Sequence, residues 1–137
     1  MDVKRSITVN GNFLLDTNIV IALLANEKPV IEKLTMAEKV FLPCIVLGEL
    51  YFGAYKSVHV DKNLVRLDEF VSGNSVLDCD AHTGKYYGRI KNGLRIKGRP
   101  IPENDIWIAA IAQQYRLTLV SRDTHFTEID DLLLETW

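Results

Sequence analysis

The stretch Phe13-Leu14-Leu15-Asp16-Thr17-Asn18 decides the fold that we expect for this chain. A short apolar run ends in an acid, a hydroxyl and an amide, and a second apolar run, Ile19 to Leu24, follows at once. This pattern predicts a buried strand whose carboxyl end presents Asp16, with a helix starting directly after it. Ligands of open α/β sheets bind outside the carboxyl ends of the strands. Asp16 therefore marks a functional site or, as the simpler alternative, caps the next helix.

Short apolar runs alternate with helical patterns along the rest of the chain. We expect strands at 13–15, 40–42, 76–77, 117–120 and 132–134, and helices at 17–25, 29–38, 43–56, 58–71, 80–96 and through 106–112. This alternation predicts an α/β protein, a three-layer α/β/α sandwich around a short, mostly parallel sheet. Right-handed crossovers would bring the ends of the strands 13–15 and 117–120 to the same edge of that sheet.

The bulk composition is that of an ordinary globular protein. With 137 residues, 47% of them hydrophobic and 25% charged, we expect one domain over residues 1–137. No apolar run reaches the ~20 residues of a membrane span, and the N-terminus lacks the apolar core of a signal peptide, so we expect a cytoplasmic protein with no membrane contact. Cys44 and Cys79 lack metal-ligand spacing and are expected to be buried thiols, while the scattered histidines argue against zinc.

Three further acids occupy settings comparable to that of Asp16. Glu49 lies on or beside the apolar face of a predicted helix, Asp105 stands in the first turn of another, and Asp123 follows a strand. Each has a simple alternative, since a helix dipole favours an acid in its first turn and Glu49 could point to water. If the four converge, their repulsion calls for a divalent cation, and an all-oxygen shell selects Mg²⁺ or Mn²⁺. Such ions activate water and stabilise the leaving oxygen of a phosphodiester.

The basic residues are unevenly distributed in a chain of net charge −2. Ala81 to Pro102 contains no acid, yet it holds six of the sixteen basic residues, namely Lys85, Arg89, Lys91, Arg95, Lys97 and Arg99. This segment could hold the phosphates of a polyanion, or it could be the solvated face of a helix.

Four segments of the chain resemble the motifs of the PIN-domain family. They are Leu14-Leu15-Asp16-Thr17-Asn18, Gly48-Glu49-Leu50-Tyr51-Phe52-Gly53-Ala54, Asn104-Asp105-Ile106-Trp107-Ile108-Ala109-Ala110 and Val120-Ser121-Arg122-Asp123-Thr124-His125-Phe126. One such element is weak evidence, whereas four in order, within a resemblance from about Phe13 to Trp137, are specific. The chain is similar to the small VapC-type toxins of type II toxin–antitoxin modules.

This resemblance implies a metal-dependent endoribonuclease acting on tRNA or rRNA. It also implies a homodimer that a VapB-type antitoxin neutralises by covering the active site. By carry-over, Asp16, Glu49, Asp105 and Asp123 would hold Mg²⁺ or Mn²⁺, Thr17 and Ser121 would be hydrogen-bonding neighbours, and Asn18 would help to position the first acid. The RNA phosphates would be guided by Lys85, Arg89, Lys91, Arg95 and Arg122. The apolar residues of helices 17–25, 29–38 and 58–71 would form the antitoxin surface.

Other families fit the acids less well. A haloacid-dehalogenase-like phosphatase needs a second acid two residues after the first, where this chain has Asn18. A receiver domain needs paired acids ahead of its phosphorylated aspartate, and residues 1–12 contain only Asp2. Two alternatives stay open at this point. One is a PIN-like RNA-binding or interaction domain without nuclease activity, and the other is an RNA-processing PIN nuclease that has no antitoxin.

Overall fold

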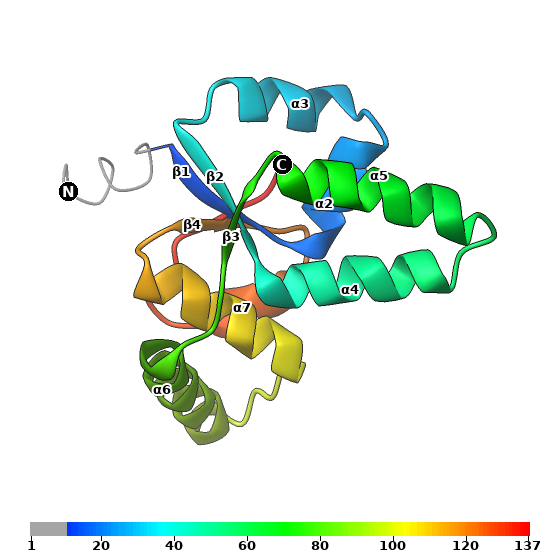
Figure 1. Cartoon of the computed structure of the whole chain (residues 1–137). Helices are drawn as coiled ribbons and strands as arrows, with labels where there is room; N and C mark the ends of the chain where they lie inside the picture. The colour runs from blue at the N-terminus through cyan, green and yellow to red at the C-terminus, as the bar shows by residue number, and fades with distance from the viewer. Residues whose placement is uncertain (1–10) are drawn as a thin grey trace.

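The centre of the fold is a sheet of five parallel strands (Figure 1). The computed structural model describes residues 11–137; residues 1–10 of the expected single domain lie outside that description. The strands are β1 (Asn12–Leu15), β2 (Lys39–Pro43), β3 (Ser75–Leu77), β4 (Thr118–Val120) and β5 (Leu134–Glu135), in the spatial order β3-β2-β1-β4-β5. The strand order reverses between β1 and β4, and the crevice at such a reversal is where open α/β sheets bind ligands.

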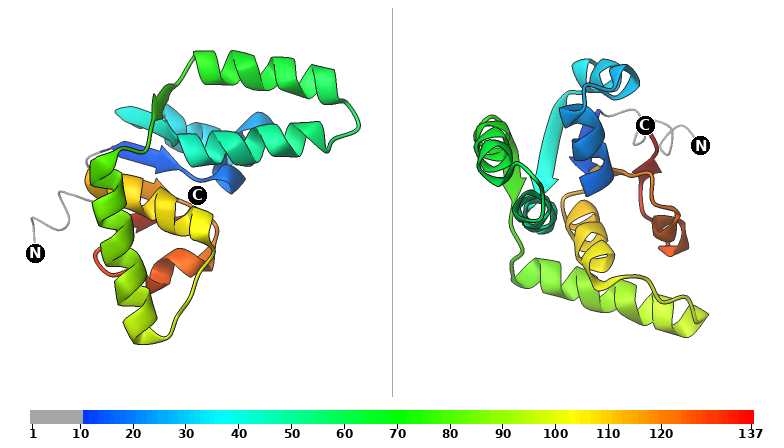
Figure 2. Two further views of the ribbon diagram at one scale, coloured as in Figure 1. Left: turned by 60° about the horizontal axis from the view of Figure 1, so that its bottom comes forward. Right: turned by 90° about the vertical axis from the view of Figure 1, so that its right-hand side faces the viewer.

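Helices cover both faces of the sheet, which confirms the expected layered α/β architecture. They are α2 (Thr17–Leu24), α3 (Lys28–Thr35), α4 (Cys44–Tyr55), α5 (Val60–Ser72), α6 (Ala81–Lys97), α7 (Glu103–Gln114) and the short 3₁₀ helix η1 (Thr124–Glu128). Figure 2 shows α2 and α3 on one side of the sheet and α6 and α7 on the other, while α4 and α5 form a hairpin that projects beyond it. Within residues 11–137, no helix has both the length and the apolar character needed to cross a membrane.

The core is centred on β1, β4 and α7. Leu14 and Leu15 of β1, Leu119 of β4, and Ile108 and Ile111 of α7 are all 0% exposed. Burying each such side chain stabilises the fold by about 1.5–3 kcal/mol. The alanines of α7 let this helix pack closely against the sheet. The buried residues of α7 begin with Asp105. The packing that stabilises the fold therefore also draws an acid into the interior.

Four sequence-based expectations need correction. Helix α3 ends at Thr35 rather than at residue 38, because the amides of Glu38 and Lys39 bond to the carbonyl of Gly11 and start β2. The last strand is Leu134–Glu135 instead of 132–134, since Leu119 and Ser121 of the β4 segment donate to the carbonyls of residues 133 and 135.

The other two corrections concern burial. Cys79 is exposed and Cys44 only partly buried, because Cys79 follows β3 outside the sheet. The spacing of Tyr87, Ile90 and Leu94 also predicts Ala81 on the inner face of α6. Ala81 is exposed, and Thr83 is buried there with Ile90 and Leu94. A polar residue takes this place because Thr83 belongs to the cap of the helix.

Asp80 caps α6, as its position before the helix predicts. Its carboxylate accepts from the amide of Thr83 at 3.0 Å and from Nε2 of Gln114 at 2.9 Å, while the amide of Asp80 donates to Oγ1 of Thr83 at 2.9 Å. This capping box satisfies amides at the helix start and ties α6 to α7.

Removing this cap should destabilise the fold. We expect Asp80→Ala to lower the thermal unfolding midpoint by a few degrees, because the amide of Thr83 and the side chain of Gln114 lose their acceptor. Asp78→Ala, at an exposed acid two residues earlier, is the matched control and should leave the midpoint nearly unchanged. Equal midpoints for both variants in a calorimetric scan would contradict the capping assignment.

Candidate active site

Asp16 lies at the end of β1, where the crevice of the sheet opens. It is 5% exposed, and its amide donates to the carbonyl of Val120 at 3.0 Å, so β1 stays paired with the β4 segment up to its last residue. Its Oδ1 accepts from the amide of Thr17 at 2.8 Å and its Oδ2 from Oγ of Ser121 at 2.7 Å. Asp16 thus caps α2 with one oxygen while the other faces the neighbouring strand end.

Ser121 joins the ends of the two central strands. Its side chain is buried, and its Oγ donates to Asp16 while accepting from the amide of Asp123 at 2.9 Å. Asn18 supports the same junction, because its Oδ1 accepts from the amide of Arg122 at 3.1 Å and its Nδ2 lies 3.4 Å from Oδ2 of Asp16. These contacts fix the spacing between the acids that follow β1 and β4.

Glu49 faces the same edge from α4. Its Oε1 accepts from Oγ1 of Thr17 at 2.6 Å, and its Oε2 lies 3.5 Å from Nδ2 of Asn104, the residue before Asp105. Thr17 therefore reaches across from the start of α2 to orient a carboxylate on another helix. Glu49 is only partly buried, so it stands at the rim of the group.

Asp105 and Asp123 complete the group of acids. Asp105 lies in the first turn of α7, is 8% exposed, and its Oδ2 is buried with no hydrogen-bond partner within residues 11–137. Asp123 follows β4 and caps η1, its Oδ1 accepting from the amide of His125 at 2.9 Å. The structure thus brings the acids from four separate segments of the chain to one edge of the sheet.

Sequence reasoning gave no role to His125, which stands among these acids. Its Nδ1 lies 2.9 Å from Oδ1 of Asp123 and 3.4 Å from Oδ2 of Asp105. Asn104, which contacts Glu49, was also missed. The one available signal was that both residues fall inside the segments that resemble the family motifs.

Burial and mutual repulsion disfavour the charged forms of these acids. Burial raises the pKa of Asp16; the hydrogen bonds from Ser121 and Thr17 oppose this, and the charges of Glu49 and Asp123 add to it. Burial also raises the pKa of Asp105 to about 6, with the charges of Asp123 and Asp16 adding and His125 opposing. Near neutral pH the site therefore favours a neutralising proton or cation.

The residues present fit a divalent cation. Most of the possible ligand atoms are carboxylate oxygens. The buried Oδ2 of Asp105 has no hydrogen-bond donor in the part of the chain that the structure describes, and a cation would satisfy it. Single ligand atoms of Asp105, Asp123 and His125 all lie within 4.8 Å of one another. Oxygen donors select hard ions such as Mg²⁺ and Mn²⁺.

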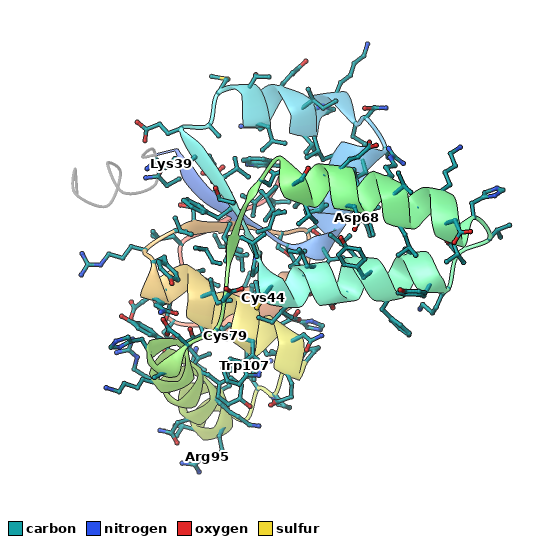
Figure 3. The ribbon with its side chains drawn as sticks, viewed as in Figure 1. Lys39, Cys44, Asp68, Cys79, Arg95 and Trp107 are labelled. Atoms are coloured by element: carbon teal, nitrogen blue, oxygen red, sulfur yellow. The ribbon has the colours of Figure 1, made fainter. Side chains whose placement is uncertain are left out.

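The basic residues expected to contact RNA differ in how they are engaged. Lys85 and Arg89 are exposed on α6, with Arg89 over the ring of Tyr86 at 4.7 Å. Lys91 pairs with Glu103 at 3.0 Å. Arg95 lies on the outer side of α6 (Figure 3) and bonds to Oδ1 of Asn92.

Arg122 is held near the end of the chain. Its guanidinium donates to Glu27 at 2.9 Å and to the carbonyl of Trp137 at 2.9 Å. Arg122 therefore ties the C-terminal residue and the α2–α3 turn to the end of β4, while its own amide bonds to Asn18.

A groove of about 590 Å³ runs between α6 and the start of α7. Its lining includes Lys91, Arg95, Pro100, Ile101, Glu103 and Ile106. Glu103 and Ile106 of this lining belong to α7, the helix that carries Asp105. Between the same two helices, Tyr87 of α6 stacks on Trp107 of α7 with ring centroids 4.1 Å apart; Figure 3 labels Trp107.

Neutralising Asp105 should stabilise the metal-free protein. Its pKa in the folded chain is about 6, against an ordinary value of 3.8, so between these values the folded state binds more protons than the unfolded state. Stability from this group therefore falls as pH rises through that window. We expect Asp105→Asn in EDTA at pH 7.5 to raise the free energy of unfolding by about 1–2 kcal/mol, measured with urea.

This gain should shrink as the pH falls toward 5, because wild-type Asp105 then carries its own proton. Asp78→Asn, at an exposed acid, is the control and should change the free energy of unfolding little. A variant less stable than the wild type at pH 7.5 would show that the Asp105 carboxylate stabilises the metal-free fold.

Comparison with known proteins gives a consistent family. The family model for the PIN domain matches residues 13–132. "Ribonuclease VapC2" of Haemophilus influenzae is 34% identical over 128 residues, covering 91% of this chain and 97% of the relative. "tRNA(fMet)-specific endonuclease VapC" of Shigella flexneri is also 34% identical, with the same coverage. The VapBC2 structure from Rickettsia felis, bound to a DNA fragment from its promoter, superposes with a TM-score of 0.85 at 32% identity, covering 91% of this chain and 98% of that one.

Proposed function

Because the chain belongs to the PIN-domain family of VapC ribonucleases, the toxins of VapBC toxin–antitoxin systems, we propose that it hydrolyses RNA at its four-carboxylate edge with the help of Mg²⁺ or Mn²⁺. The observation that carries this proposal is the buried Oδ2 of Asp105, which lies beside Asp123 and His125 and has no hydrogen-bond donor among residues 11–137. A domain that only bound a partner, without catalysing a reaction, would gain nothing from this buried carboxylate oxygen, because the oxygen lowers the stability of the fold. A metal-dependent nuclease, in contrast, needs such an oxygen to bind its ion.

Three of the acids would bind the ion directly, and Glu49 would act on a water molecule beside it. Asp16, Asp105 and Asp123 would hold the cation, and Ser121 keeps Asp16 turned toward the crevice. Glu49, oriented by Thr17, presents Oε2 beside Asn104, where it can bind a water or accept its proton. A bound divalent cation would polarise the attacking water and offset the charge that develops on the phosphodiester.

The substrate and its path follow from the relatives and from the charge of α6. We expect structured RNA to be cut, with tRNA as the first candidate because the Shigella relative is named for tRNA(fMet). The phosphates would follow the exposed side chains of Lys85, Arg89 and Arg95. Lys91 and Arg122 already have acidic partners and would contribute by exchanging them for phosphates. An enzyme with such substrates would act in the cytoplasm.

A VapB-type antitoxin is the proposed protein partner. The relative from Rickettsia felis was solved as a VapBC assembly. In this chain, large apolar side chains are exposed on α2, α4 and α5, namely Ile21, Phe52, Tyr55 and Val65. These positions add α4 to the helices expected from the sequence, and exposed apolar side chains of this kind are what an antitoxin segment would cover. The homodimer implied by the family resemblance stays a prediction.

Cleavage of mixed tRNA and rRNA by the purified protein tests the nuclease. We expect cutting at discrete sites with Mg²⁺ or Mn²⁺, none in EDTA, and a loss of roughly a hundredfold or more in Asp16→Asn. Asp61→Asn, at an exposed acid of α5, should cut as the wild type does. Failure to cut with either ion, or cutting that survives EDTA, would contradict the proposal.

Charge reversal on α6 tests the RNA path. We expect Arg89→Glu with Arg95→Glu to weaken RNA binding and to reduce the slope of log affinity against log salt by about 2, one for each lost phosphate contact. Binding is measured in EDTA so that the RNA stays intact. Lys56→Glu with Lys62→Glu, on the α4–α5 hairpin, makes the same charge change away from α6. Equal RNA affinities of the two double variants at low salt would show that α6 does not bind the RNA phosphates.

A further inference from the structure

His125 differs from the other histidines of the chain in facing two acids on separate elements. His59 and His82 are exposed, on the turn before α5 and in the first turn of α6. The Nδ1 of His125 lies 2.9 Å from Oδ1 of Asp123, which follows β4, and 3.4 Å from Oδ2 of Asp105, in the first turn of α7. Its backbone amide also donates to Asp123 at 2.9 Å, which fixes the position of the residue on η1.

The geometry is that of three ligands around one ion. Single ligand atoms of Asp105, Asp123 and His125 lie within 4.8 Å of one another. Two atoms bound to the same cation at about 2.0–2.3 Å are separated by about 3 Å when adjacent and by up to about 4.6 Å when opposite. The distances from Nδ1 to the two carboxylates fall in this range without any movement of the backbone.

The imidazole of His125 cannot satisfy the hydrogen-bonding needs of both carboxylates by direct contact. At 3.4 Å the contact from Nδ1 to Oδ2 of Asp105 is longer than an ordinary hydrogen bond. This oxygen has no hydrogen-bond donor within residues 11–137 although the residue is only 8% exposed. One nitrogen offers one proton, so it cannot donate well to both carboxylates. A cation between the three groups would satisfy the two oxygens and the nitrogen together.

We propose that Nδ1 of His125 is a ligand of the divalent cation held by Asp105 and Asp123, giving the site a mixed nitrogen–oxygen shell. This inference rests on the proposed function only for the presence of that cation. Mg²⁺ prefers oxygen ligands and keeps several waters, whereas transition-metal ions accept imidazole nitrogen more readily. His125 therefore makes the site favour Mn²⁺ over Mg²⁺ more strongly than a site of carboxylates alone would.

Electron spin echo envelope modulation of bound Mn²⁺ tests this ligand directly, because it detects the magnetic coupling of a directly bound ¹⁴N. The protein is used without a histidine tag, so that its three histidines are the only imidazoles present. We expect nitrogen modulation in the wild type and in His59→Gln, and its loss in His125→Gln. In titrations followed by the free Mn²⁺ signal, His125→Gln should bind Mn²⁺ about tenfold more weakly. Competition should show a smaller change for Mg²⁺.

The outcomes separate this inference from the proposed nuclease. Mn²⁺ that binds without nitrogen modulation, or modulation that persists in His125→Gln, overturns the role of His125 while metal-dependent cleavage stands. Absence of Mn²⁺ binding together with absence of cleavage overturns both. The wild-type spectrum decides whether nitrogen is bound even if His125→Gln fails to fold, and thermal unfolding of each variant in EDTA reports its folding.

Discussion

Repulsion between carboxylates withdrawn from water is the constraint on which the rest of this structure depends. Asp16 and Asp105 are almost fully buried, and their pKa values are raised mainly because burial disfavours the charged form. A fold that served only its own stability would place apolar or hydrogen-bonded groups there. This chain keeps the acids together, and within its described residues an oxygen of Asp105 has no donor, which a proton or a cation can satisfy. In the proposed function, this cost in stability would prepare the site for an ion.

The scaffold that tolerates this repulsion is the contact between β1, β4 and α7. Parallel strands present their carboxyl ends at one edge, and the reversal of strand order beside β1 leaves a crevice there. Helix α7 packs into the core through its isoleucines and alanines, so the apolar driving force that stabilises the fold also holds Asp105 in place. Ser121 and Asn18 then tie the two strand ends together by hydrogen bonds. The hydrophobic core and the polar junction together offset the repulsion of the acids.

Local sequence patterns predicted the parts of this structure that depend on neighbours along the chain. The apolar run before Asp16 gave β1, the nearly all-apolar helix after Asp105 gave α7, and Asp80 was recognised as a cap. What escaped prediction depends on distant contacts. Helix α3 stops early because residues 38 and 39 bond to Gly11, whose φ of +77° suits glycine. Lys91 pairs with Glu103 across two helices, and His125 turns toward Asp105 from another element. Contacts of this kind, between residues on different elements, cannot be predicted from the hydrophobic periodicity or the motif spacing of the sequence.

We infer that a divalent cation replaces a proton as the group that neutralises the buried acids. Calorimetric titration of Mn²⁺ into the metal-free protein, in buffers of different ionisation enthalpy, measures the protons released on binding. With the pKa of Asp105 at about 6, we expect proton release at pH 6 that falls toward zero at pH 8. Mn²⁺ binding with no proton release at pH 6, or no binding at either pH, would contradict it.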